Sequence, residues 1–242
     1  MRPEERIAAL GFSEADTATL ASHFLDAESR GKLGHGLSRI DWLETLDGLQ
    51  PDARPQRLLA EPGYERWDGN GAIGYLTLAA ICDAQLADPP VHARVVVASN
   101  CFPTGMLGWY VRRLAGGGLA AALTATSPAR LPHPEGGEPL AGTNPLAIAI
   151  PSSDGKPLVA DVSMGAVTYG DVLRGGAAPE ELVAFGGEQS HKAFALALAL
   201  DLLVGALAGA GYGAVLVVAP PEADPVPALR ARAAGLRLPG DA

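Results

Sequence analysis

The sequence predicts an α/β fold that is not of the Rossmann type. Apolar runs of strand length alternate with longer segments of helical spacing along the 242 residues. The clearest strand pair is Leu146–Ile150 and Pro157–Val162, because the Asp154-Gly155 step between them is a strong hairpin signal. No GxGxxG fingerprint follows a strand and opens a helix, and no Walker A sequence is present.

Composition narrows the class of protein further. Hydrophobic residues make up 48% of the chain and charged residues 19%, as expected for a globular domain with an ample core. A net charge of −9 argues against a nucleic-acid partner. Cys82 and Cys101 form neither a disulfide framework nor a metal-ligand cluster, so we expect no metal site. The polar start Met1–Arg6 does not resemble a signal peptide, and we expect a cytoplasmic protein.

We expect a single catalytic unit, residues 1–242, made of three parts. Residues 1–62 form a mainly helical N-terminal part, residues 63–220 an α/β core that binds cofactor and substrate, and residues 221–242 a C-terminal tail. The elements expected before the hairpin are helices at Pro3–Leu10 and Ser13–Arg30, a loop over residues 50–62, a strand at Tyr64–Asp68, a helix at Ile73–Leu86, a strand at Val91–Ala98, a helix at Met106–Leu114 and a strand at Leu119–Thr126.

The segment from Ala193 to Pro220 has the apolar length of a membrane span. It carries one charge, Asp201, and a charge at the centre of a span costs about 2.5–3.5 kcal/mol. Several glycines also divide the run. We therefore predict no membrane partner, but a buried helix from Lys192 to Ala208 and then a buried strand at Ala214–Ala219.

His35 and Arg39 are four residues apart in a segment that can open a helix, so they would share one face. A guanidinium can hold a small carboxylate with two hydrogen bonds while the imidazole handles a proton. The alternative is an ordinary helix N-terminus with a solvated arginine. Similarly, Ser190-His191-Lys192 is either a phosphate-binding helix start or a simple serine cap.

Asp161 stands near the end of an apolar strand. A carboxylate there is costly unless it is paired or exposed. It is therefore either a surface aspartate on the wet face of the hairpin or an acid that orients a catalytic partner. Thr143, beside the strand that precedes it, could donate a hydrogen bond to a substrate carboxylate or carbonyl.

Several segments, in this order, carry a resemblance to a known family. They are Gly34-His35-Gly36-Leu37-Ser38-Arg39, Val95-Val96-Val97-Ala98-Ser99-Asn100-Cys101, Gly142-Thr143-Asn144-Pro145-Leu146, Ala160-Asp161-Val162-Ser163, His191-Lys192-Ala193 and Leu238-Pro239-Gly240. Together they resemble the type-2 malate/L-lactate dehydrogenase family, in particular its 2,3-diketo-L-gulonate reductase branch.

The resemblance implies a mixed-sheet α/β fold, a homodimer and an NAD- or NADP-dependent oxidoreductase acting on a small 2-oxo or 2-hydroxy acid or a cyclic imino acid. It implies that His35 donates the proton, that Asp161 pairs with His35 and that Arg39 holds the substrate carboxylate. Asn100 and Cys101 correspond to a loop at the substrate. The residues implied at the cofactor are Ser163, Met164, Gly165, Ala166, Val167, His191, Lys192, Pro239 and Gly240.

Two departures from the family pattern keep a second function open. Cys101 replaces the family's loop histidine, and the region between Arg174 and Gly186 is much shorter. The alternative is a degenerate member that binds a ligand or partner without redox turnover.

Overall fold

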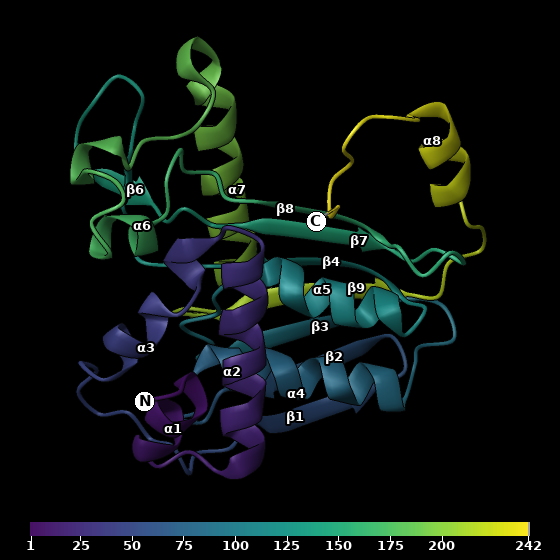
Figure 1. The fold of residues 1–242 in the computed structure, drawn as a ribbon, viewed down its shortest axis with the longest axis horizontal. Helices are drawn as coiled ribbons and strands as arrows, with labels where there is room; N and C mark the ends of the chain where they lie inside the picture. Colours follow the sequence, from purple (N-terminus) through teal and green to yellow (C-terminus); the bar gives the residue numbers. More distant parts are fainter. Residues whose placement is uncertain (242) are drawn as a thin grey trace.

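A seven-stranded mixed sheet forms the centre of the protein, in a computed structural model that describes residues 1–241 (Figure 1). The strand order is β1-β2-β3-β9-β4-β7-β8. β2 and β3 run parallel, and the other neighbours within residues 1–241 are antiparallel. The strands are β1 Gln56–Glu61, β2 Tyr64–Asp68, β3 Arg94–Ser99, β4 Ala120–Ala125, β7 Leu146–Ile150, β8 Leu158–Val162 and β9 Ala214–Ala219, with a separate small pair β5 Leu131–Pro132 and β6 Pro139–Ala141. The predicted α/β class is confirmed. The sheet is also not of the Rossmann type, because a Rossmann sheet would be mostly parallel.

Helices cover both faces of this sheet. Successive side chains of a strand point to opposite faces. In β9, Leu216 and Val218 therefore belong to the main core with α4 and α5, while Val215 packs with Val204 and Ala208 of α7. The helices are α1 Pro3–Ala9, α2 Glu14–Ser29, α3 Ser38–Leu43, α4 Gly74–Ala87, α5 Leu107–Gly116, α6 Tyr169–Leu173, α7 Ser190–Ala208 and α8 Val226–Arg232, with 3₁₀ turns η1 Leu33–His35, η2 Pro179–Glu181 and η3 Gly187–Gln189.

The N-terminal helices attach to the sheet through α4. A second core joins Leu20 and Phe24 of α2, Ile40 of α3 and Tyr75 of α4. This contact places η1 and α3 beside one end of the sheet, where α6 also lies (Figure 1).

The predicted loop over residues 50–62 is wrong in its second half, which forms β1. All six β1 residues are exposed at the sheet edge, and the strand pairs only with β2 in the described chain. Because neither face of this edge strand is buried, its residues do not alternate between apolar and polar. The pattern that predicts a strand is therefore missing here.

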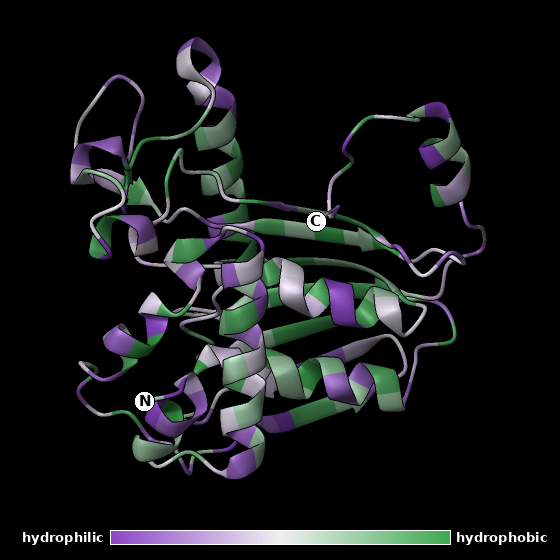
Figure 2. Cartoon of the chain, viewed as in Figure 1, coloured by the Kyte–Doolittle hydropathy of each residue, from purple (hydrophilic) through white to green (hydrophobic). Residues whose placement is uncertain are grey.

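The expectation that the 192–208 helix is buried is also wrong. α7 lies at the predicted place, but Leu196, Leu202, Leu203 and Leu207 are 49%, 71%, 46% and 38% exposed. The helix is apolar along most of its length (Figure 2), and by length and composition it could cross a membrane. Such a helix is also typical of the core of a soluble protein, yet only 28% of its apolar window is buried. The strand that follows it, β9, lies at the centre of the sheet.

Candidate active site

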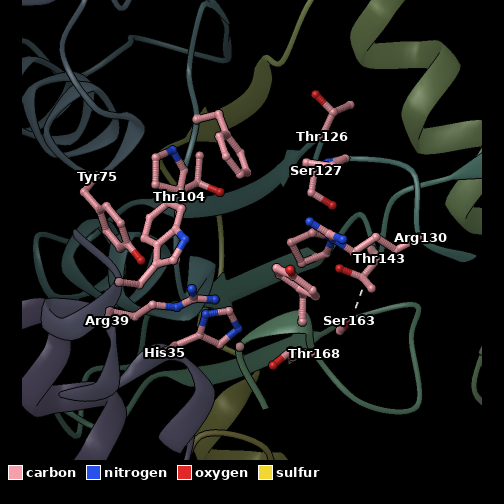
Figure 3. A pocket seen from close by; sticks show the side chains of 18 residues that line it. His35, Arg39, Tyr75, Thr104, Thr126, Ser127, Arg130, Thr143, Ser163 and Thr168 are labelled. Atoms are coloured by element: carbon pink, nitrogen blue, oxygen red, sulfur yellow. Dashed lines mark hydrogen bonds between the residues drawn. The ribbon is translucent and has the colours of Figure 1, made fainter. Parts of the chain in front are cut away.

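A cavity of about 290 Å³ opens where the N-terminal helices meet the end of the sheet. It lies near the lower end of the size range of small-molecule sites, roughly 300–1,000 Å³. Its walls come from η1 and α3, from the loops that follow β3 and β4, from the residues just before β7, and from the segment between β8 and α6 (Figure 3). The polar and aromatic lining residues are His35, Arg39, Trp42, Tyr75, Phe102, Thr104, Thr126, Ser127, Arg130, Thr143, Ser163, Thr168 and Tyr169. No Asp or Glu of the described chain lines this cavity.

His35 lies at the end of η1 and lines both this cavity and a second one of about 340 Å³. Burial, together with the positive charges of Arg39 and Lys32, lowers the pKa of His35 to about 4, and the negative charge of Asp171 opposes the fall. The imidazole is therefore neutral in the free protein at pH 7. Its Nδ1 atom is buried and has no hydrogen-bond partner within residues 1–241. An unpaired buried ring nitrogen is uncommon, and here it belongs to a histidine that lines two cavities.

Arg39 is held by its backbone surroundings rather than by an acid. Its Nε donates to the carbonyl of Gly34 at 2.8 Å, and its guanidinium stands 5.2 Å from the centre of the Trp42 ring. No salt bridge to Arg39 occurs in residues 1–241. A Cβ atom at Gly170 would approach Arg39 NH2 to 2.6 Å and overlap the Gly34 carbonyl, so only glycine fits there. The free end of the guanidinium points into the cavity (Figure 3).

The Gly142–Leu146 segment is locked by Asn144, whose side chain is fully buried. Asn144 Nδ2 donates to Ala197 O at 3.0 Å and to Asp201 Oδ1 at 3.1 Å, both on α7, and its Oδ1 accepts from Ser127 N at 3.1 Å. One amide therefore ties α7 and the loop after β4 to the cavity wall. Thr143, the preceding residue, lines the cavity.

The second cavity receives part of the predicted cofactor segment. Ser163, Gly165, Ala166 and Val167 line it together with Lys32. Met164 does not, because its side chain is 3% exposed in a core cluster of α7 and the β5–β6 pair. The two cavities share His35, Ser163 and Thr168.

Asp161 lines the second cavity but forms no hydrogen bond to His35 in the described chain. Its Oδ2 accepts instead from the backbone amide of Gly108, at 3.0 Å, in the first turn of α5. Burial raises the pKa of Asp161, and the hydrogen bond from Gly108 opposes that rise. The expected direct pairing is therefore absent here, and neither the surface interpretation nor the orienting one fits alone.

The predicted substrate contacts of Asn100 and Cys101 are not found. Asn100 has a left-handed backbone with φ of 51°, and its Nδ2 donates to Asp68 Oδ2 at 2.9 Å, outside the main cavity. This conformation turns Cys101 inward, where it is 0% exposed in the main core. Burial raises the pKa of the Cys101 thiol to about 12, so it stays protonated. Phe102, the following residue, lines the cavity instead.

Four further residues predicted at the cofactor line neither cavity. His191 and Lys192 are exposed in the first turn of α7. Pro239 and Gly240 lie against β8, where Pro239 O accepts from Val159 N at 3.2 Å. The structure does not bring these four residues to His35.

Several lining residues were not singled out from the sequence. Trp42, Tyr75, Ser127, Arg130 and Tyr169 all face the main cavity. Trp42 lies one helical turn from Arg39, which was predicted to face a ligand, and that spacing is a usable signal. Arg130 and Tyr169 come from irregular segments that carry no periodicity.

Comparison with known proteins agrees with this architecture. Residues 3–182 match a family model described as malate/L-lactate dehydrogenase. The 2,3-diketo-L-gulonate reductase of Citrobacter koseri is 33% identical over 182 residues, which are 72% of this chain and 53% of that protein. The Salmonella typhi protein of the same name is 32% identical over 181 residues, or 71% of this chain and 53% of its own. The chain thus spans about half the length of the curated relatives it matches.

Solved structures show the same fold. A dehydrogenase from Sinorhizobium meliloti superposes with a TM-score of 0.81 at 25% identity, covering 99% of this chain and 86% of the other. A Δ1-piperideine-2-carboxylate reductase from Pseudomonas syringae superposes with a TM-score of 0.79 at 23% identity, covering 99% and 88%.

Proposed function

The chain belongs to the malate/L-lactate dehydrogenase family, and on that premise we propose that it is an NAD- or NADP-dependent oxidoreductase of small 2-oxo or 2-hydroxy acids or cyclic imino acids. The observation that carries the proposal is the position of His35. This residue lines two cavities at once, and Arg39 faces the first of them without a carboxylate partner in the described chain.

Arg39 binds the substrate carboxylate in the first cavity. A guanidinium fixed at Nε by Gly34 still has its outer nitrogens for a charge-assisted hydrogen bond. Thr143 supplies a hydroxyl on the opposite wall (Figure 3). Together they orient the substrate carbon that changes oxidation state toward His35.

His35 moves the proton at the substrate oxygen or nitrogen. The neutral imidazole of the free protein accepts a proton from a 2-hydroxy acid in the oxidation direction. An anionic substrate on Arg39 offsets the Arg39 charge that helps to lower the pKa of His35, so the pKa rises when substrate binds. That rise makes the imidazolium accessible for reduction. Asp161 and Asp171 both line the second cavity and supply negative charge on that side of His35, and the charge of Asp171 raises the pKa of the imidazole.

The second cavity fits one end of a nicotinamide cofactor. Ser163 offers a hydroxyl, Lys32 a positive charge, and the buried Nδ1 of His35 an unpaired polar atom at the boundary between the cavities. Ser163 and Lys32 would hold that end of the cofactor, whose chemistry would be hydride transfer to or from the substrate. The choice between NAD and NADP follows from residues beyond this end of the cofactor.

The test is a steady-state assay with NADH and NADPH over a panel of 2-oxo acids and cyclic imino acids. We expect turnover with at least one acid, and its loss in His35→Gln. Folded protein that consumes neither cofactor with any acid contradicts the proposal.

A binding role without turnover is the second candidate. It is favoured by the position of His191, Lys192, Pro239 and Gly240 outside both cavities. Fluorescence titration separates the two candidates, because this role predicts no saturable binding of NADH or NADPH.

We also propose that the chain is a homodimer. The exposed side of α7 carries Leu196, Leu202, Leu203 and Leu207, while the one charge in this stretch, Asp201, accepts a hydrogen bond from Asn144. An apolar helix face is normally covered. A second copy of the chain would cover it. Light scattering after size exclusion tests this, since Leu203→Glu should convert a dimer to a monomer.

A further inference from the structure

The cavity that contains Arg39 carries a second guanidinium, that of Arg130. Two arginines and no acid of the described chain line this site, although the whole protein has a net charge of −9. Figure 3 shows Arg39 and Arg130 entering from opposite sides with both guanidinium groups directed toward the centre. Such a concentration of positive charge in an acidic protein suits a ligand with more than one negative group.

Arg130 is positioned by an aromatic ring rather than by a salt bridge. Its guanidinium carbon lies 3.3 Å from the centre of the Tyr169 ring, which is a close cation–π contact. The side chain is half-buried and forms no ion pair or side-chain hydrogen bond within residues 1–241. Its donors therefore remain available to a ligand.

The support beneath Arg130 is fixed to the wall that carries Arg39. Tyr169 is the first residue of α6, whose start is closed by Thr168 Oγ1 donating to Asp171 Oδ2 at 2.7 Å. The next residue, Gly170, packs against Gly34, the residue whose carbonyl holds Arg39. The two guanidinium groups are thus held in a defined relation to one another.

We propose that Arg130 is a specificity-determining residue that binds a second carboxylate of the substrate, so that the site prefers dicarboxylic 2-oxo acids. This inference rests on the proposed function, in which Arg39 holds the carboxylate beside the reacting carbon. Arg130 then holds the carboxylate at the far end, with the hydroxyls of Thr126 and Ser127 on the same wall.

A cofactor phosphate is a weaker fit to Arg130. The residue lines the first cavity and not the second, whose cation is Lys32. If Arg130 binds a substrate carboxylate, its replacement should change the kinetic constants of the substrate alone. If it binds a cofactor phosphate, its replacement should change the KM of the cofactor.

The test compares 2-oxoglutarate with 2-oxopentanoate, which match in chain length and differ in the second carboxylate. The protein should favour 2-oxoglutarate in kcat/KM, and Arg130→Met should reduce that preference by about 10- to 100-fold, the factor for a hydrogen bond to a charged group. Arg130→Lys should restore part of it. Arg66→Met, which removes an exposed arginine outside the described cavities, should leave it unchanged. A preference that Arg130→Met leaves within about twofold, or a rise confined to the KM of the cofactor, overturns the inference.

Thermal stabilisation by succinate and by butyrate gives a readout independent of turnover. We expect succinate to stabilise the protein more than butyrate does, and Arg130→Met to remove the difference. Equal stabilisation by the two acids contradicts the role of Arg130 even in a protein without turnover. Turnover of 2-oxopentanoate alone, with no succinate effect, contradicts this inference but supports the proposed function.

Discussion

The carboxylate of Asp161 accepts a hydrogen bond from the backbone amide of Gly108, and this contact joins the hairpin β7–β8 to the first turn of α5. The positive end of a helix stabilises a carboxylate there. The same carboxylate faces the cavity that contains His35 and Lys32. One acid therefore holds the hairpin against α5 and also lines a cavity beside His35.

Asp161→Asn separates these two roles. An amide oxygen can still accept from Gly108, so the melting temperature should fall by no more than about 2 °C. The lost negative charge should lower kcat about tenfold or more, because the imidazolium of His35 loses one of the two carboxylates that line its second cavity. Asp161→Ala should lower both. Thermal melts and steady-state kinetics of the two variants provide the measurement, and equal kcat in Asp161→Asn and the unmodified protein rejects the charge role.

His35→Gln should reduce kcat by about 10²–10⁴-fold, the usual contribution of a general acid or base. The fold should tolerate the change, because Nδ1 of His35 has no partner to lose in the described chain. Circular dichroism melts beside the kinetics check this expectation. A variant that keeps full activity would remove His35 from the proton transfer.

Arg39→Lys should raise the KM for the acid about tenfold or more while kcat changes less. Lysine keeps the charge but loses the planar pair of donors and the Nε contact with Gly34. Initial rates across substrate concentrations measure the split. If kcat falls and KM stays constant, Arg39 acts on the transition state and not as a carboxylate anchor.

Acidification should destabilise the fold through two buried histidines. Burial lowers the pKa of His23 to about 3 and that of His35 to about 4, from an ordinary value of 6.5. Between about pH 4 and pH 6.5, these histidines are protonated in the unfolded chain but neutral in the folded one. The free energy of unfolding therefore decreases as the pH falls through that window. Each pKa unit corresponds to about 1.4 kcal/mol at most. Denaturant titrations at about pH 7 and about pH 5 should show the loss, and His23→Gln should reduce it.

Asn144→Ala should destabilise the protein by roughly 2–4 kcal/mol, because it leaves buried partners on α7 and on the loop after β4 without their hydrogen bonds. Gln56→Ala, on the exposed edge strand β1, provides a matched control with little effect. Denaturant unfolding measures both. Equal stability of the two variants would show that the amide does not hold the cavity wall.

The sequence supported the central elements because they are locally well marked. The hairpin β7–β8 follows from its Asp154-Gly155 turn. β3 follows from the apolar run Val95–Ala98, but it begins at Arg94 and not at the predicted Val91, which is 83% exposed. The strand β1 was not predicted, because all six of its residues are exposed and show no apolar alternation. The prediction that α7 is buried is wrong, because a helix that is apolar on every side can still leave one face exposed. Local sequence does not record which face of an apolar helix the rest of the chain leaves uncovered.

The site divides in the same way. His35, Arg39, Thr143 and Asp161 were found from spacing and from the family pattern, and all four line one or both cavities. Cys101 was misplaced because the left-handed backbone at Asn100 reverses the direction of the next side chain, a feature that no periodicity reports.

Transfer of deuterium from C4-labelled NADH or NADPH to a 2-oxo acid tests the central claim most directly. In a single turnover, the account predicts a 2-hydroxy acid that carries one deuterium at C2, formed by the unmodified protein and absent with His35→Gln over the same time. Two results would contradict the proposal that His35 gives the proton to the substrate: recovery of unlabelled 2-oxo acid from both proteins, or equal deuterium label in the product of both.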